Sequence, residues 1–182
     1  MRLPRARRTN TGVANELGYA PQESNVVQRG LQHIVASKPG ARLFSKFLHA
    51  VDKPPFRVSN GRLTLPSLLA GLPVVMLTTT GRKSGEPRTM PLLAIPVGDD
   101  LAVIGSNFGQ EHTPGWVYNL EANPSATIAY RDAAIDVTAR RADIAEADSV
   151  FAGAAQVYPG YANYRERADH REIRVFVLES TS

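Results

Sequence analysis

Cysteine is absent from this sequence of 182 residues. The chain therefore cannot use thiolate catalysis, a cysteine-ligated zinc or iron–sulfur site, or a disulfide framework. The four histidines, His33, His49, His112 and His170, show neither HExxH spacing nor an acidic partner pattern, so we expect no metal site. A Gly-x-Ser-x-Gly nucleophile elbow is missing as well. The familiar metal and nucleophile chemistries are thereby excluded.

Long apolar stretches are also lacking. The longest, residues 63–77, contains two prolines and one glycine and is shorter than the roughly 20 apolar residues of a membrane-spanning helix. Arg7 and Arg8 form a twin-arginine pair, but the polar residues 9–24 supply no apolar core for an export signal. We therefore expect a cytoplasmic protein that does not cross a membrane.

The composition is typical of one globular domain. Hydrophobic residues make up 43% of the chain and charged residues 21%. Residues 1–23 are arginine-rich and poor in apolar side chains, which predicts a flexible basic arm, followed by a single domain over residues 24–182. The net charge of +4 fits a nucleic acid, an anionic membrane surface or an acidic small molecule, and charge alone does not choose among them.

Two amphipathic helices are predicted behind the arm. Apolar residues recur at helical spacing over residues 26–35 and again over residues 43–51, and each pattern ends at a proline pair or a Pro-Gly step. Such faces usually pack on a core. The alternative is that they lie on a membrane surface, which would make the protein peripherally membrane-associated.

Short β-rich runs begin after Pro73. Gly98-Asp99-Asp100 and Arg131-Asp132 are typical of hairpin turns between them. About six strands in mostly hairpin order predict an α+β fold, an antiparallel β-barrel with surrounding helices. The runs are Val74–Thr80, Thr89–Val97, Leu101–Ser106, Ala126–Tyr130, Ala134–Arg140 and Ile173–Leu178.

Two further helices are predicted between the strands. The first has Thr113 as N-cap and Pro114 at its first helical position, and it runs to about residue 122. The second starts at Asp143 and reaches about residue 157, with Glu146 completing a capping-box pattern.

The turn after the first strand carries three cations. Gly81 and Gly85 permit tight turns that expose backbone N–H groups, and Arg82, Lys83 and Arg88 supply charged donors suited to phosphate or carboxylate. The turn is not a Walker loop, because the lysine lies between the glycines and no helix follows. An anion pocket is the functional interpretation, and a polar hairpin tip is the structural one.

A second segment is suited to a planar ligand. Small residues in Gly105-Ser106-Asn107-Phe108-Gly109 let a ring approach the backbone, and Trp116 near a helix N-terminus could offer a flat surface. The alternative makes the only tryptophan a core anchor. Tyr158, Tyr161 and Tyr164 could line the mouth of a pocket and donate a proton, although packing is the commoner fate of such residues.

Taken in order, these segments resemble the deazaflavin-dependent nitroreductase family, split β-barrel proteins related to the flavin-nucleotide-binding oxidases. The resemblance covers about Leu31 to Leu178. It rests on Leu77-Thr78-Thr79-Thr80-Gly81-Arg82-Lys83-Ser84-Gly85, Arg88, Pro91-Leu92, Ser106 with Gly109, Pro114-Gly115-Trp116, Asn119-Leu120, Ala122-Asn123-Pro124, and Tyr158-Pro159 with Tyr161.

The resemblance implies a reductase that uses the deazaflavin coenzyme F420, with FMN as the weaker alternative cofactor. Reduced F420 would pass a hydride to a quinone, a nitroaromatic or an activated alkene, with Ser106 or Tyr161 orienting the acceptor or relaying a proton. The catalytic candidates are Ser106, Tyr158, Tyr161 and Tyr164. The implied cofactor-binding residues are Thr80, Arg82, Lys83, Arg88, Pro91, Leu92, Leu93, Ser106, Asn107, Phe108, Gly109, Trp116 and Asn119.

Family members with well-studied reductase activity often carry a basic residue and two glycines where this chain reads Ser106-Asn107-Phe108-Gly109. This departure bears on the local cofactor contacts and on the shape of the acceptor. The expected partner is a small-molecule electron acceptor, not a nucleic acid, and the protein is expected to be a monomer or a homodimer.

Two other functions compete with this one. A non-catalytic carrier of F420 or FMN would keep the basic turn but need no acceptor pocket. A nucleic-acid or membrane-surface module would instead act through the arginine arm and the amphipathic helices.

Overall fold

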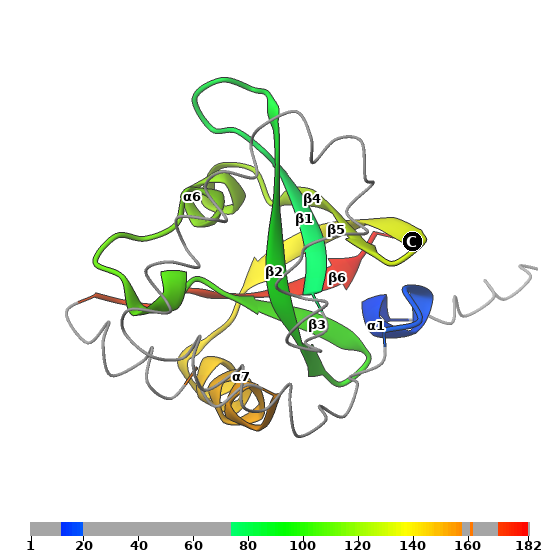
Figure 1. Ribbon diagram of the computed structural model, residues 1–182, viewed down its shortest axis with the longest axis vertical. Helices are drawn as coiled ribbons and strands as arrows, with labels where there is room; N and C mark the ends of the chain where they lie inside the picture. The colour runs from blue at the N-terminus through cyan, green and yellow to red at the C-terminus, as the bar shows by residue number, and fades with distance from the viewer. Residues whose placement is uncertain (1–11, 20–73, 158–160, 162–170, 182) are drawn as a thin grey trace, which may run out of the picture.

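The computed structural model describes residues 12–19, 74–157, 161 and 171–181. Six antiparallel strands close into a barrel in the order β1-β2-β3-β6-β5-β4 (Figure 1), which confirms the predicted fold class. The strands are β1 (Val74–Thr80), β2 (Pro87–Val97), β3 (Asp100–Ile104), β4 (Ser125–Tyr130), β5 (Ala133–Arg141) and β6 (Val175–Ser180).

Alternation along the strands separates an interior from an exterior face. In β1, Val75, Leu77 and Thr79 are buried while the residues between them are half-buried, as a period of two requires. The interior cluster is rich in aliphatic residues from all six strands. A second apolar cluster lies between the barrel wall and helix α7 (Ile144–Val157), where Val150, Phe151 and Ala154 pack on Ile95 and Ala102.

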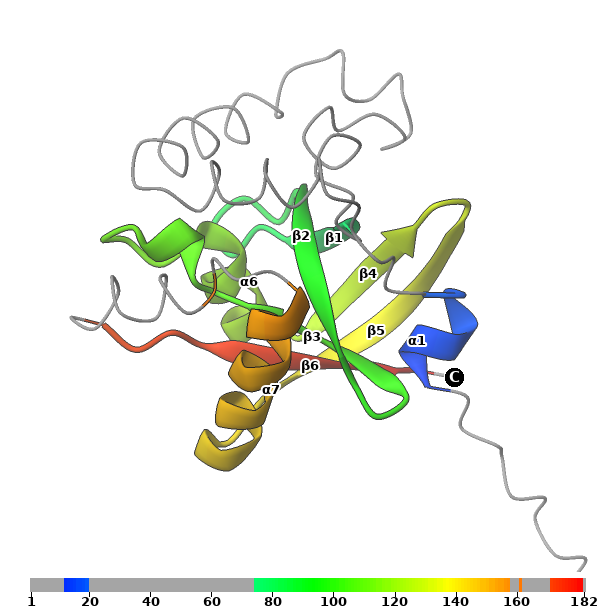
Figure 2. The same cartoon turned by 60° about the horizontal axis from the view of Figure 1, so that its bottom comes forward.

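Helices close the barrel on opposite sides. Helix α6 (Gly115–Ala122) and the short helix α1 (Val13–Glu16) lie on opposite sides of the strands in both ribbon views (Figures 1 and 2). Each sends side chains into the interior cluster: Val117 and Leu120 from α6, and Val13 from α1. The barrel is therefore filled with side chains and plugged by a helix on each side.

Helix α1 corrects part of the prediction of a flexible arm. Residues 12–19 are packed, with Val13 0% and Leu17 4% exposed. The backbone N–H of Val13 donates to the Asp100 carboxylate at 3.2 Å, and the Tyr19 hydroxyl donates to the Ala94 carbonyl at 2.5 Å. The domain thus includes this segment, and the rest of the predicted arm lies outside the described residues.

The N-terminal caps of α7 and α6 can be compared with the predicted ones. Asp143 caps α7 as predicted, because its Oδ1 accepts the Glu146 N–H at 2.8 Å. The Glu146 carboxylate accepts in return from the Asp143 backbone N–H, which confirms the predicted capping box, and it also binds the Arg140 guanidinium at 2.8 Å. Helix α6 begins one residue later than predicted. Pro114 is its N-cap and Gly115 is its first helical residue.

Several predictions lie outside the described residues: the helices over residues 26–35 and 43–51, and the side chains of Phe108, Tyr158 and Tyr164. Peripheral membrane contact was assigned to those two helices and has no support in the described part of the chain. Across the same described residues, no helix has the length and hydropathy needed to span a bilayer.

Candidate functional site

The β1–β2 hairpin ends in a tight, cross-bonded turn. The Gly81 N–H donates to the Glu86 carbonyl at 2.8 Å, and the Gly85 N–H donates to the Gly81 carbonyl at 2.7 Å. Gly85 has φ +71°, a left-handed conformation that glycine adopts without steric cost. A side chain at Gly81 would come within 2.7 Å of the Ser84 hydroxyl. The hydroxyl can turn away, so the left-handed Gly85 is the glycine that the turn requires most clearly.

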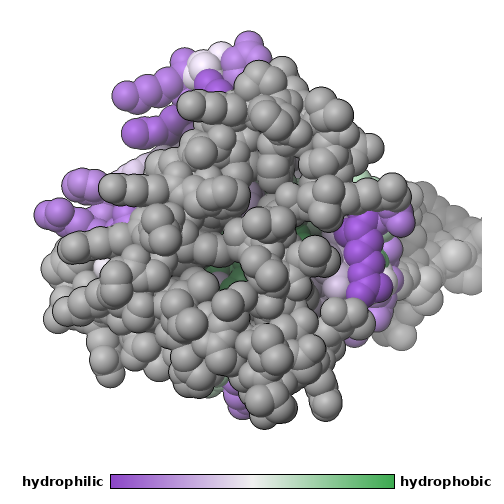
Figure 3. Space-filling view, viewed as in Figure 1, coloured by the Kyte–Doolittle hydropathy of each residue, from purple (hydrophilic) through white to green (hydrophobic). Residues whose placement is uncertain are grey.

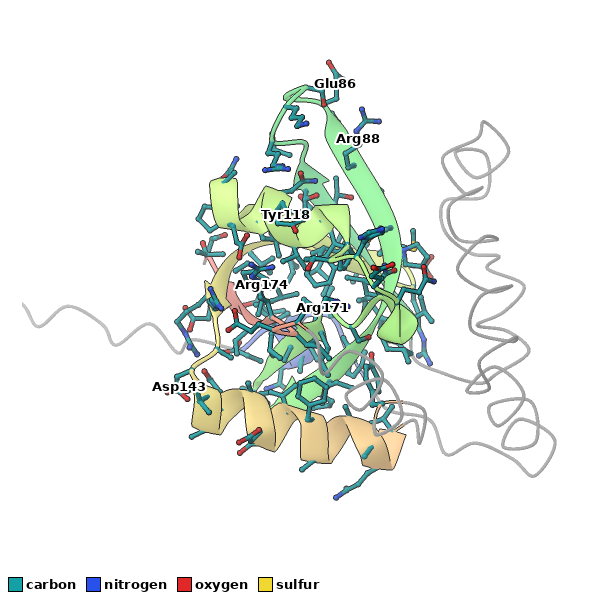
Figure 4. All side chains as sticks on the ribbon, turned by 90° about the vertical axis from the view of Figure 1, so that its left-hand side faces the viewer. Glu86, Arg88, Tyr118, Asp143, Arg171 and Arg174 are labelled. Carbon is teal, nitrogen blue, oxygen red and sulfur yellow. The ribbon has the colours of Figure 1, made fainter. Side chains whose placement is uncertain are left out.

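The three predicted cations of the turn all reach solvent. Arg82, Lys83 and Arg88 are exposed, and within the described part of the chain no carboxylate forms an ion pair with them. Glu86 is the acid of the turn, and Figure 4 shows it beside Arg88 at the tip of the hairpin. Hydrophilic side chains gather over this hairpin on the molecular surface (Figure 3). The turn carries a net positive charge available to an external anion.

Asn119 fixes the turn to helix α6. Its side chain is 8% exposed, its Oδ1 accepts the Arg82 N–H at 3.1 Å, and its Nδ2 donates to the Thr79 hydroxyl at 3.0 Å. These bonds join residues about 40 positions apart in the sequence. Asn119 was predicted as a cofactor ligand, but its amide is used to hold the basic turn in place.

A groove of about 440 Å³ opens between the turn and α6. Its volume lies within the range of about 300–1,000 Å³ typical of small-molecule sites. One wall consists of the basic turn and the first residues of β2, and the other wall consists of the first residues of α6. The lining residues are Gly81, Arg82, Lys83, Ser84, Arg88, Thr89, Met90, Gly115, Trp116, Tyr118 and Asn119.

Trp116 takes the position of a core anchor, the alternative kept in the sequence analysis, and only a small part of its side chain borders the groove. The indole is only 4% exposed and packs edge-on against Phe176, with ring centroids 6.1 Å apart. It belongs to the interior cluster and reaches the groove only as part of the wall. The large apolar area of tryptophan is more stabilising when buried in the barrel than at the rim.

Tyr118 is a groove residue that sequence reasoning missed. The Arg82 guanidinium lies over its ring at 4.7 Å from the centroid, and the Arg174 guanidinium lies over it at 5.6 Å. Arg174 is also paired with Glu121 of α6 at 2.8 Å. Tyr118 comes two residues after Trp116, so helical geometry directs it to another face of α6. This spacing is the feature of the sequence from which its position could have been predicted.

The Ser106 loop is built as a rigid unit. Ser106 is 6% exposed and precedes a single 3₁₀ turn, η2 (Asn107–Gly109). Asn107 and Gly109 both have positive φ, and the Asn107 amide donates to the His112 carbonyl at 2.8 Å. None of the described residues of this loop lines the groove at the basic turn. The basic turn and the Ser106 loop, which the resemblance assigns to the tail and the ring of one cofactor, thus share no wall of this groove.

Arg171 holds this loop and was also missed. Its guanidinium donates to the backbone carbonyls of Gly105, Ser106 and Gln110 at 3.2, 2.7 and 3.2 Å. Burial lowers the pKa of Arg171, and the neighbouring charge of Arg174 lowers it further. Both arginines lie between α6 and α7 (Figure 4). Residues more than 60 positions apart meet here, and local sequence carries no signal for such a contact.

The predicted cofactor-binding residues of strands β1 and β2 lie on both faces of the barrel wall. Leu92 packs against the interior cluster, whereas Leu93 packs against the α7 cluster. Pro91 pairs with Met76, one residue out of phase with Leu92, and Thr80 is likewise one residue out of phase with the buried Thr79. Because successive residues of a strand point to opposite faces, Pro91, Leu92 and Leu93 cannot all direct their side chains at one ligand.

Tyr161 is buried away from the groove. Its side chain is 6% exposed and lies in the α7 cluster with Ile104 and Phe151. This position fits the packing role that the sequence analysis kept as the alternative. Among the described residues, no group of His, Asp and Glu side chains is arranged to hold a metal ion.

Comparison with known proteins identifies one family. A family model described as F420H(2)-dependent quinone reductase matches residues 55–180. An F420H(2)-dependent quinone reductase of Mycobacterium tuberculosis is 33% identical over 128 residues, which cover 68% of this chain and 83% of that protein.

Two solved structures are similar at above 30% identity. One, described as an F420-H2 dependent reductase, is 36% identical with a TM-score of 0.54, and the match covers 59% of this chain and 94% of the other. The second, described as a domain-swapped dimer, is 32% identical with a TM-score of 0.56, and the match covers 69% of this chain and 93% of the other.

Proposed function

Because the chain belongs to the F420H(2)-dependent quinone reductase family, we propose that its basic groove binds the anionic end of F420 while the enzyme reduces a quinone. The chain is an F420H2-dependent oxidoreductase. The family name refers to quinone reduction, and the broader nitroreductase label of the sequence analysis stays a prediction. Catalytic turnover, which the family implies, is favoured over the carrier alternative.

The observation that carries the proposal is the unpaired positive charge of the β1–β2 turn. Arg82, Lys83 and Arg88 have no acidic partner among the described residues, and they border a groove of cofactor size. The tail of F420 carries a phosphate and carboxylates. Guanidinium and ammonium groups form their strongest hydrogen bonds with such oxygens, so the donor set fits the anionic part of the cofactor.

The residues of the site have distinct parts in this mechanism. Reduced F420 supplies the hydride, as cofactors generally carry the difficult chemistry of their enzymes. Arg82, Lys83 and Arg88 would hold the anionic tail, and Asn119 keeps their turn in place through its two hydrogen bonds. The Ser106 loop, fixed by Arg171, stays the predicted neighbour of the deazaflavin ring and of the acceptor.

The acceptor-side tyrosines are less well supported. Tyr158 and Tyr164 lie outside the described residues, and Tyr161 is buried in the α7 cluster. Ser106 is therefore the described candidate for orienting the acceptor. We propose nitroaromatics and activated alkenes as further acceptors, and stopped-flow oxidation of the reduced cofactor against a panel of these compounds and quinones tests their range.

The oligomeric state belongs to the same proposal. Monomer and homodimer are both predicted from the sequence, and the description of one relative as a domain-swapped dimer favours the homodimer. Light scattering on the full-length chain distinguishes the two.

Loss of one cation from the turn is expected to weaken F420 binding. We predict that Lys83→Ala lowers F420 affinity by about tenfold, because a hydrogen bond to a charged group contributes roughly 1.5–3 kcal/mol. Titration that follows the fluorescence of F420 measures this change. Raising the ionic strength should weaken wild-type binding more than binding to the variant, since fewer charges remain to be screened.

Arg131→Asn is the matched control. Arg131 lies in the β4–β5 turn with φ +53° and its guanidinium over Tyr130 at 5.1 Å, so it is, like Lys83, a cation of a hairpin turn, but it does not line the groove. Asparagine tolerates positive φ, which removes the charge without straining the backbone. Equal losses of affinity in Lys83→Ala and Arg131→Asn would show a general charge effect and contradict the assignment of the groove.

A further inference from the structure

Helix α6 brings an aromatic ring against one cation of the basic turn. Tyr118 and Arg82 both line the groove, and the guanidinium carbon lies 4.7 Å from the ring centroid. A cation within about 6 Å of a tyrosine ring is attracted by the negative face of the ring. The contact therefore restricts an arginine side chain that has many rotatable bonds and reaches solvent.

Both ends of this contact are fixed by other interactions. The Arg82 N–H is bound by the buried Asn119 side chain at 3.1 Å, which sets where the arginine leaves the backbone. On the other side, the Arg174 guanidinium lies 5.6 Å from the Tyr118 centroid and is paired with Glu121 at 2.8 Å. The ring is thus placed by its helix and accompanied by a second arginine, while Arg82 keeps its donors for another partner.

We propose that Tyr118 is a positioning residue that holds the Arg82 guanidinium in the groove and so makes the enzyme selective for a deazaflavin with an anionic tail. The inference rests on the proposed binding of F420 in this groove. Ordering a long side chain on binding costs about 0.5–1.5 kcal/mol, and a side chain already held against a ring loses less freedom. Tyr118 acts through Arg82, so its effect is confined to ligands that carry the negative charge.

The test compares two ligands in one titration. F420 carries the phosphate and carboxylate tail, and the riboside of the same deazaflavin lacks it. Tyr118→Leu is expected to lower F420 affinity by about three- to tenfold and to leave riboside affinity unchanged, whereas Tyr118→Phe keeps the ring and stays within about twofold of the wild type. Parallel losses for both ligands would overturn the inference, because they would show that the ring itself contacts the deazaflavin.

A double-variant cycle separates positioning from a structural effect. In an Arg82→Ala background, Tyr118→Leu is expected to cause no further loss of F420 affinity, because the side chain that it positions is gone. Equal fold losses with and without Arg82 would contradict the inference. Thermal unfolding of each variant checks the fold, and Tyr118→Met, which removes the ring but keeps a long apolar side chain, provides the reading if Tyr118→Leu is unstable.

The same experiment distinguishes this inference from the proposed function. If the wild type binds F420 and Lys83→Ala weakens it, the groove is the site, and an unaffected Tyr118→Leu variant refutes only the role of Tyr118. If Lys83→Ala and Arg82→Ala bind F420 as the wild type does, the proposed site itself fails.

Discussion

A single buried amide connects the two walls of the groove. Asn119 accepts from the Arg82 backbone and donates to the Thr79 hydroxyl, and Thr79 in turn donates to the Arg88 carbonyl at 3.4 Å. Two of the three turn cations are therefore tied through their backbones to one side chain of α6. At the scale of residues, the position of the charge depends on the hydrogen bonds of buried polar side chains.

Removing this amide should cost stability as well as affinity. Asn119→Ala leaves a backbone N–H and a buried hydroxyl without their partner, and we expect the free energy of unfolding to fall by about 1–3 kcal/mol. F420 affinity should fall as well, since the turn is released from α6. Urea denaturation and the fluorescence titration measure the two effects.

Asn123→Ala is the control for this substitution. Asn123 follows the same helix and accepts the Ser125 N–H at 3.1 Å in an exposed bond, so its loss should cost clearly less. An Asn119→Ala variant no less stable than Asn123→Ala would contradict the role assigned to the buried amide.

Sequence reasoning at this scale could predict which cations lie together, because they are close in the chain. Arg82, Lys83 and Arg88 share one turn and are found together at the groove, because a hairpin brings them close whatever the rest of the chain does. Tyr118 and Arg171 were missed because their partners come from other elements. For Trp116 the sequence left a ligand surface and a core anchor open, and its burial depends on contacts with the barrel interior that local sequence does not show.

Among the elements, helix α1 departs most from the sequence-based expectation. It has four residues, no side-chain N-cap bond and a basic sequence before it, so local signals do not predict it. Its stability comes from contacts with the β2–β3 turn, where the Asp99 carbonyl accepts the Ala14 N–H at 2.9 Å. The strands were predicted to within a few residues because alternation and turn residues are features of short stretches of sequence. Gly98, with φ +59°, is one such turn residue.

The attachment of this segment should depend on pH at the alkaline end. Burial raises the pKa of Tyr19 well above its usual value near 10, and the neighbouring Tyr130 raises it further. The folded protein therefore keeps the Tyr19 proton where the unfolded chain has lost it. Stability from Tyr19 is fully present below about pH 10 and is lost as the pH rises above that value.

Tyr19→Phe tests this pH dependence. At neutral pH we expect a loss of about 1 kcal/mol in the free energy of unfolding, from the missing bond to the Ala94 carbonyl. Above pH 10 the wild type should lose up to about 1.4 kcal/mol more per pH unit than the variant. Urea unfolding across pH 8–11 measures both. Parallel pH profiles of the two proteins would show that Tyr19 ionises equally in both states.

At the scale of the whole molecule, the described residues form a filled barrel, and the proposed cofactor site lies on its surface. Helices α1 and α6 plug the interior on opposite sides, and the groove lies outside, between α6 and the β1–β2 turn. The fold class could be predicted from the order of short strands. The residues that line the groove from α6, such as Tyr118, could not, because their position depends on how the barrel closes.

Titration of the full-length wild-type protein with F420, beside FMN under the same low-salt conditions, tests the central claim most directly. The unpaired cations of the groove predict saturable F420 binding that is tighter than FMN binding and weakens as salt is added. Absence of measurable affinity for both cofactors at low ionic strength would contradict the account.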